Sequence, residues 1–159
     1  MKLWNNKNST NKTVNQFTVG KDTYYDLFLA EYDCQASIAH AKMLQKIGVF
    51  TEHELDKIVT ELEKIKVKSE KGELLIEDKF EDIHSKIEYE LTKKLGDLGK
   101  KIHTARSRND QILVSIQLYL KKEINEIKTL TKTFFDLLIV LAEKNKNYLM
   151  PGYTHFQVA

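Results

Sequence analysis

The residue types best suited to binding a small anion are concentrated in residues 99 to 111, which read Gly-Lys-Lys-Ile-His-Thr-Ala-Arg-Ser-Arg-Asn-Asp-Gln. Arg106 and Arg108 carry planar guanidinium groups that can bind a carboxylate through two parallel hydrogen bonds. A long predicted helix follows directly, and its free N–H groups and positive dipole end also favour anions. Composition alone allows the alternative of a solvated basic loop, in which Ser107 or Asn109 caps the helix.

A carboxylate and an imidazole stand two residues apart at Asp82 and His84. Side chains at positions i and i+2 of a regular helix do not face each other. We therefore expect the pair to lie at a helix start or to reach different groups. The alternative interpretation is an acidic helix N-terminus without a further role.

A third polar segment follows the long predicted helix, in Met-Pro-Gly-Tyr-Thr-His-Phe-Gln at residues 150 to 157. Pro151 and Gly152 are expected to end the helix and to turn the chain, which exposes Thr154 and His155. Imidazole titrates near neutral pH, so His155 is a candidate acid–base group. An inert histidine in a turn is the alternative.

The segment Asp-Cys-Gln-Ala-Ser-Ile-Ala-His, residues 33 to 40, is rich in small residues. By itself it indicates only close helix packing around Ala36 and Ser37. Cys34 is the one cysteine of the chain, which excludes an internal disulfide and favours a small buried apolar side chain.

Helices must position these groups, because six glycines and one proline are too few for the turns of a strand-rich fold. We predict an all-α fold with short elements before residue 105. They are, in order, an extended or disordered arm over 1–20, one or two helices over 24–47 ended by Gly48, a helix opened by a Thr51–Glu54 capping box and reaching about Val67, a charged linker over 69–79, a helix over 81–95 ended near Gly96, and a basic loop over 96–104.

Residues 109–144 contain neither glycine nor proline and carry a wide apolar stripe. At 1.5 Å per residue this helix would be roughly 54 Å long. A wide stripe suits a helical bundle better than a two-stranded coiled coil. The preceding helices are too short to cover it, so we expect downstream sequence or other subunits to do so. We predict a helical domain over 1–107, with its N-terminal arm, and the start of a bundle domain over 108–159.

Composition argues against several classes of function. Basic and acidic residues nearly balance, 25 against 23, and their signs are interspersed, so we expect no nucleic-acid or membrane partner. There is no G-x-G-x-x-G or P-loop motif, and the histidines match no compact metal-ligand spacing, so we expect no cofactor and no metal. The first residues lack the apolar segment of a secretory signal, which favours the cytoplasm.

Taken together, these segments resemble the argininosuccinate lyases of the aspartase/fumarase superfamily. The run His-Thr-x-Arg-Ser-Arg-Asn-Asp-Gln is specific within that superfamily, since fumarases and adenylosuccinate lyases differ there. The other segments that carry the resemblance are Leu3-Trp4, Val14-Asn15-Gln16-Phe17-Thr18, Glu81-Asp82-Ile83-His84 and Met150 to Gln157.

The resemblance implies a reversible β-elimination of argininosuccinate to L-arginine and fumarate, in arginine biosynthesis, by a homotetramer whose sites are each shared among subunits. It implies substrate contacts at Ser37, Asn109 and Thr154. By the same resemblance, the segments that form the active site contain Asp82, His84, Arg106 and Arg108. His155 matches a histidine of the family that is assigned an acid–base role.

The family's Gly-Ser-Ser-x-Met-Pro loop, which supplies the catalytic serine, is not among these residues. We therefore expect an N-terminal fragment that is inactive alone. Ala36 and Ala105 stand where glycine is common, a change that a backbone with negative φ tolerates. The alternatives are a non-catalytic, crystallin-like protein on the same scaffold, or a sister enzyme such as adenylosuccinate lyase.

Overall fold

The structure is a computed structural model that describes residues 12–77, 79–149 and 152–158. It is helical except for one small hairpin, which confirms the predicted all-α fold. The chain forms two compact units, Met1–Leu120 and Lys121–Ala159, each with its own internal contacts. The predicted domain boundary between residues 107 and 108 stays a prediction.

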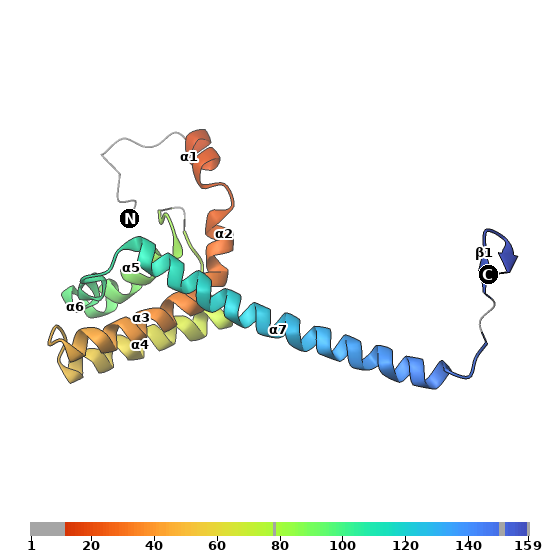
Figure 1. The fold of residues 1–159 in the computed structure, drawn as a ribbon. Helices are drawn as coiled ribbons and strands as arrows, with labels where there is room; N and C mark the ends of the chain where they lie inside the picture. The colour runs from red at the N-terminus through yellow and green to blue at the C-terminus, as the bar shows by residue number, and fades with distance from the viewer. Residues whose placement is uncertain (1–11, 78, 150–151, 159) are drawn as a thin grey trace. The chain divides into compact units, whose positions relative to one another are not determined.

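The elements follow one another as short helices and then one long helix (Figure 1). In chain order they are α1 (Lys12–Val19), α2 (Asp22–Asp26), the 3₁₀ turn η1 (Leu27–Leu29), α3 (Ala30–Lys46), α4 (Glu52–Glu70), α5 (Ile83–Leu95), α6 (Asp97–Lys100), the 3₁₀ turn η2 (Lys101–His103), α7 (Arg108–Asn145), β1 (Tyr153–Thr154) and β2 (Gln157–Val158).

Two predicted irregular segments are helical instead. The expected arm over 1–20 contains α1, because residues 12–19 have no glycine or proline and Thr18 can donate its hydroxyl to the carbonyl of Val14. The expected loop over 96–104 contains α6 and η2, where Asp97 and Lys100 form an i,i+3 ion pair that supports a single turn. Residues 1–11, which include the Leu3-Trp4 match, lie outside the described residues.

The predicted helix ends are confirmed at several places. Thr51 caps α4 by accepting the N–H of Glu54, and the Glu54 carboxylate accepts the N–H of Thr51, which is the capping box expected from the sequence. Gly48 follows α3 with φ of 82°, the left-handed conformation that glycine adopts without strain.

The core of the first unit lies between α3, α4 and α5. Leu44, Ile58, Leu62 and Ile83 are fully buried there, and each contributes about 1.5–3 kcal/mol relative to an exposed side chain. Cys34 is a free, buried member of the same core, as predicted. This core holds α3 and α5 against each other, and these two helices carry half of the candidate site.

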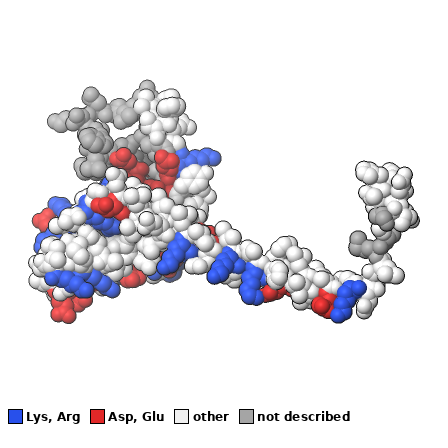
Figure 2. Space-filling view, in the orientation of Figure 1, with Lys and Arg blue, Asp and Glu red and all other residues white. Residues whose placement is uncertain are grey.

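The last residues of α7, together with the hairpin, make up the second unit. Ile124, Leu130, Phe134 and Leu141, which belong to the apolar stripe predicted over 109–144, are exposed along α7. Figure 2 shows uncharged surface between the few lysines and acidic residues of this unit. Among the described helices, none is long and apolar enough to cross a membrane.

Candidate active site

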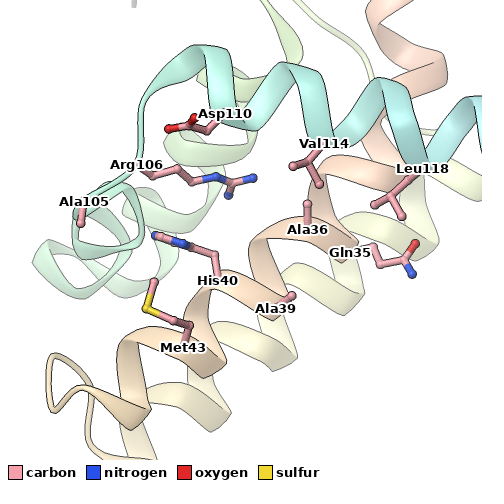
Figure 3. Close-up of a pocket in the computed structure, with 10 residues that line it drawn as sticks. All are labelled: Gln35, Ala36, Ala39, His40, Met43, Ala105, Arg106, Asp110, Val114 and Leu118. Atoms are coloured by element: carbon pink, nitrogen blue, oxygen red, sulfur yellow. The ribbon is translucent and has the colours of Figure 1, made fainter.

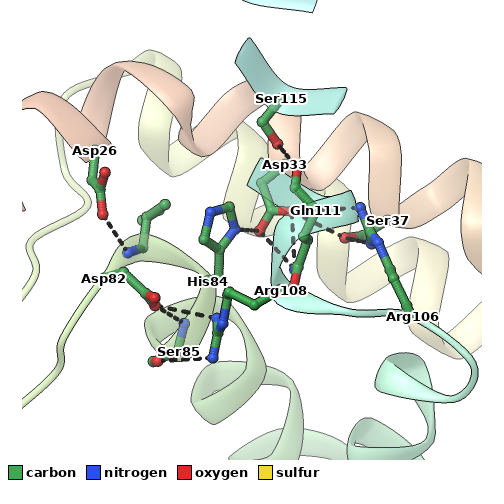
Figure 4. A network of polar contacts seen from close by, with 11 residues as sticks. Asp26, Asp33, Ser37, Asp82, His84, Ser85, Arg106, Arg108, Gln111 and Ser115 are labelled. Carbon is green, nitrogen blue, oxygen red and sulfur yellow. Dashed lines mark hydrogen bonds and ion pairs between the residues drawn. The ribbon is translucent and has the colours of Figure 1, made fainter. Parts of the chain in front are cut away.

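Polar side chains from α3, α5 and the start of α7 meet inside the first unit (Figure 4). The sequence predicted five of them as site residues. They are Ser37, Asp82, His84, Arg106 and Arg108.

Asp82 joins the start of α5 to the start of α7. It is the N-cap of α5, and its Oδ1 accepts the N–H of Ser85 at 2.7 Å. Nη1 of Arg108 donates to the same oxygen at 3.2 Å, and Nη2 of Arg108 donates to Oγ of Ser85 at 3.3 Å. The guanidinium side chain remains 24% exposed, so further N–H donors of Arg108 are open to a ligand.

A second carboxylate, from α2, also lies at the start of α5. Oδ2 of Asp26 accepts the N–H of Ile83 at 3.2 Å, which satisfies a helix N–H that has no partner within α5. Burial raises the pKa of Asp26, and the hydrogen bond from Ile83 opposes that rise. The N-terminus of α5 therefore holds two acidic groups, Asp26 and Asp82.

His84 points to a different group from Asp82, as the i, i+2 spacing predicted. Its ring is 2% exposed, and Nδ1 lies 3.0 Å from Oδ2 of Asp33 on α3. This is an ion-pair distance rather than an aligned hydrogen bond within the described residues.

Asp33 has four polar neighbours although it is fully buried. Besides His84, it accepts hydrogen bonds from Nε2 of Gln111, at 3.1 and 3.3 Å, and from Oγ of Ser37, at 3.4 Å. Nη2 of Arg106 lies 4.0 Å from its Oδ1. Three elements that are distant in the sequence are thus connected through one carboxylate.

Arg106 lies on the opposite side of Asp33 from His84 (Figure 4). Its Nη1 donates to Oγ of Ser37 at 2.9 Å. Burial lowers the pKa of Arg106, while the negative charges of Asp33 and Asp110 oppose that change. Its ordinary pKa is so high that the group stays cationic, and the site keeps a buried positive charge.

The structure shows which of the two candidates, Ser107 or Asn109, caps the start of α7. Oγ of Ser107 accepts the N–H of Asp110 at 3.2 Å, and the Asp110 carboxylate accepts the N–H of Ser107 at 3.0 Å. This hydrogen bond from Ser107 is the main reason why the pKa of Asp110 is lowered. Ser107 is therefore the cap, and Asn109 is exposed with no hydrogen bond from its side chain within the described part of the chain.

Ala105 does not have the negative φ that the sequence analysis expected for it. Its φ is +55°, so an alanine occupies the left-handed conformation that glycine adopts more easily. Ala36 lies within α3 and meets that condition. The strain at Ala105 lies next to Arg106 in the sequence, which is where strained backbone tends to be retained for a functional reason.

A groove of about 550 Å³ lies beside this network, between α3 and α7 (Figure 3). Its lining is mostly small or apolar. The lining residues are Gln35, Ala36, Ala39, His40, Met43, Ala105, Arg106, Asp110, Val114 and Leu118. Nε2 of His40 lies 3.0 Å from the carbonyl of Thr104, which ties α3 to the turn before α7.

Thr154 and His155 lie in the second unit, and both are exposed there. Thr154 pairs with Gln157 across the hairpin, and the turn between them has φ of 50° at His155 and 62° at Phe156. Two positive φ values are the requirement of a type I′ turn, for which glycine and asparagine are favoured. The participation of Thr154 and His155 in the site stays a prediction.

Sequence reasoning did not select Asp33, Gln111 or Ser85 as site residues. A signal was available for Asp33, because it lies four positions before Ser37 and so shares its helix face. The pairing of Gln111 with Asp33 spans 78 positions and has no local signature. Only the packing of α7 against α3 reveals it.

Comparison with known proteins gives a consistent result. The family model described as "Lyase" matches residues 5–159. The chain is 47% identical to an argininosuccinate lyase of Bacteroides thetaiotaomicron over 158 residues, which are 99% of this chain and 35% of the relative. It is 45% identical to that of Aquifex aeolicus, over 96% of this chain and 33% of the relative.

The chain thus spans about a third of the length of the curated relatives it matches. The resemblance that the sequence motifs indicated is confirmed, and so is the all-helical fold expected with it. With the family model covering the chain from residue 5 onward, the protein belongs to the lyase family.

Proposed function

We propose that the full-length protein is an argininosuccinate lyase, which splits argininosuccinate reversibly into L-arginine and fumarate. The observation that carries the proposal is a polar cluster in which His84 and Arg106 lie beside the buried Asp33 and Arg108 pairs with Asp82, in a chain 47% identical to an enzyme of that name. Arginine biosynthesis and a cytoplasmic location belong to the same proposal.

The chemistry suits these side chains. Removal of a proton next to a carboxylate leaves a carbanion whose negative charge spreads onto that carboxylate. Donors aimed at the developing charge lower the barrier because they stabilise the transition state more than the substrate. Arg108 has spare N–H donors, and Asn109 is exposed one residue later at the positive end of α7.

The remaining roles follow the family resemblance. Ser37, Asn109 and Thr154 would contact the substrate, and Asp82, His84, Arg106 and Arg108 would form the surrounding site. His155 would act in proton transfer to the departing guanidino nitrogen or would orient groups that do so. The serine base would come from a segment of the full-length protein outside these 159 residues.

A homotetramer with shared sites is also part of the proposal. The exposed apolar side chains of α7 support it, since helices with such a wide stripe are typical of bundles. A shared site would supply Thr154 and His155 from a neighbouring subunit. The partners we propose are therefore argininosuccinate, arginine, fumarate and further copies of the same chain.

The direct test is the ultraviolet absorbance of fumarate after argininosuccinate is added to the purified full-length protein. The proposal expects fumarate and arginine in equal amounts. Turnover of adenylosuccinate with no reaction of argininosuccinate would assign the protein to a sister enzyme. No turnover of either substrate by a well-folded tetramer would favour the non-catalytic, crystallin-like alternative.

A further inference from the structure

We infer that Asp33 is a positioning residue of this site, whose buried carboxylate orients His84 and Arg106 toward the ligand. The inference rests on the proposed function. It adds a residue that contacts no substrate itself and acts through two other side chains of the site. The burial of Asp33, the groups it contacts and the hydrogen-bonding capacity of each of them carry the inference.

A fully buried carboxylate is costly to hold in a fold unless charges and hydrogen bonds compensate it. Asp33 is 0% exposed. Its partners come from two other elements, namely His84 on α5 and the pair Arg106 and Gln111 at the start of α7. A charge needed only for packing could be replaced by an apolar side chain, so its presence among site residues suggests a role in the site.

The carboxylate favours one tautomer of His84. Nδ1 lies 3.0 Å from Oδ2 of Asp33 without being aligned as a hydrogen-bond donor. A carboxylate presents only lone pairs, so a proton on Nδ1 is preferred over a nitrogen lone pair beside this oxygen. The other nitrogen, Nε2, is then the one left to act on a ligand. A second group that holds one nitrogen of an imidazole commonly sets both its tautomer and its orientation.

The carboxylate also fixes Arg106 through Ser37. The hydroxyl of Ser37 accepts from Nη1 of Arg106 and donates to Oδ1 of Asp33. Its proton is thereby committed, and one lone pair remains. In this arrangement Ser37 can accept a hydrogen bond from an amino or guanidino group of a ligand, whereas it cannot donate to a carboxylate.

Several charged groups surround His84. Asp33 faces it from α3, Asp26 interacts with it from α2, and Asp82 lies at the start of its own helix, α5. The nearby cations are Arg106, in the turn before α7, and Arg108, at the first residue of α7.

The experiment compares Asp33→Asn with Cys34→Ala in the full-length enzyme. Both side chains are fully buried neighbours on α3, but Cys34 is a member of the hydrophobic core. We expect Asp33→Asn to lower kcat by about 10–100-fold, the usual effect of losing a group that orients a site residue.

The Cys34→Ala control should lower the melting temperature and leave kcat unchanged. Asp33→Glu, which restores the charge, should return kcat toward the wild-type value. The inference is wrong if Asp33→Asn loses only thermal stability and keeps the kcat of the wild type. If Asp33→Asn does not fold, Gln111→Leu removes two hydrogen bonds to the carboxylate and should lower kcat about tenfold. An unchanged kcat in that variant would also overturn the inference.

A readout independent of turnover separates this inference from the proposed function. Nitrogen-15 NMR of histidine-labelled protein reports the tautomer of His84, identified by its loss in His84→Asn. We expect the Nδ1-protonated form in the wild type and a mixture in Asp33→Asn. The same tautomer in both proteins would exclude the positioning role, whether or not argininosuccinate is the substrate.

Discussion

The two parts of α7 differ in which side chains they bury. In residues 108–120 the buried side chains are polar, with Gln111 on Asp33 and Ser115 donating its hydroxyl to the carbonyl of Gln111. In residues 121–145 large apolar side chains are exposed, Leu130 and Phe134 among them. Buried polar groups and exposed apolar surfaces are the informative exceptions to ordinary burial. The first part of α7 therefore contributes side chains to the buried polar network, and the second carries exposed apolar side chains.

The largest expected effect is on catalysis, from a substitution in the first part of α7, residues 108–120. Arg108→Ala in the full-length enzyme should lower kcat/KM by about 10²–10³-fold, since it removes donors aimed at a developing negative charge. The melting temperature should change far less, because the Arg108 side chain is partly exposed. Lys132→Ala, on the exposed part of α7, is the control and should preserve activity. Equal losses of activity and stability in Arg108→Ala would favour the simple helix-cap interpretation.

The next comparison sets a buried leucine against an exposed one. Leu44→Ala should lower the free energy of unfolding of the 159-residue chain by about 2–5 kcal/mol, because it opens a cavity in the core. Leu130→Ala should change it by less than about 0.5 kcal/mol, since Leu130 is 61% exposed. Urea denaturation measures both. A large effect at Leu130 in the monomeric chain would mean that this surface is already covered.

A smaller effect is expected where the backbone is strained beside the site. Ala105→Gly should raise the free energy of unfolding by about 1 kcal/mol, since glycine adopts a φ of +55° without the clash of a Cβ atom. Gly99→Ala, in the neighbouring α6, is the opposite case, because an added Cβ would lie 2.6 Å from the backbone of Leu91. Stabilisation by both substitutions, or by neither, would contradict this explanation of the turn.

The smallest expected effect is on the pH dependence of stability, and it comes from Glu54, which lies on α4 and not on α7. Hydrogen bonds from Thr51, and then from Lys101, lower the pKa of Glu54 from 4.5 to about 2. The folded state thus binds this proton less readily than the unfolded chain. The stabilisation of the folded state by ionised Glu54 is fully present above about pH 4.5 and is lost as the pH falls toward 2. Glu54→Gln should flatten the pH dependence of stability in that window, and an unchanged slope would exclude this contribution.

The sequence predicted the elements better than the contacts. The Thr51–Glu54 capping box, Gly48 and the uninterrupted stretch over 109–144 are local signals, and each matches the structure. The helix α1 was not predicted, because residues 1–20 as a whole are rich in asparagine and threonine, and this composition hides the lack of a helix breaker in residues 12–19. Local composition also gave no indication that α6 and η2 would fold as turns.

The candidate site was only partly predictable for a similar reason. Arg106, Arg108 and His84 were identifiable because residue type and motif indicate their chemistry. The carboxylate that lies between His84 and Arg106 was not, since Asp33 reaches His84 and Gln111 only after α3, α5 and α7 have packed together. Long-range pairing of this kind depends on tertiary structure and leaves no periodic trace in the sequence.

A crystal structure of the full-length protein with fumarate bound would test the assignment of the active site most directly. We expect a tetramer in which one fumarate carboxylate contacts Arg108 and Asn109 of one subunit and Thr154 of a neighbouring subunit, with His155 in the same cleft. Fumarate bound elsewhere, or Thr154 and His155 remote from the network of Asp33, Asp82 and His84, would contradict the assignment of this network as the active site.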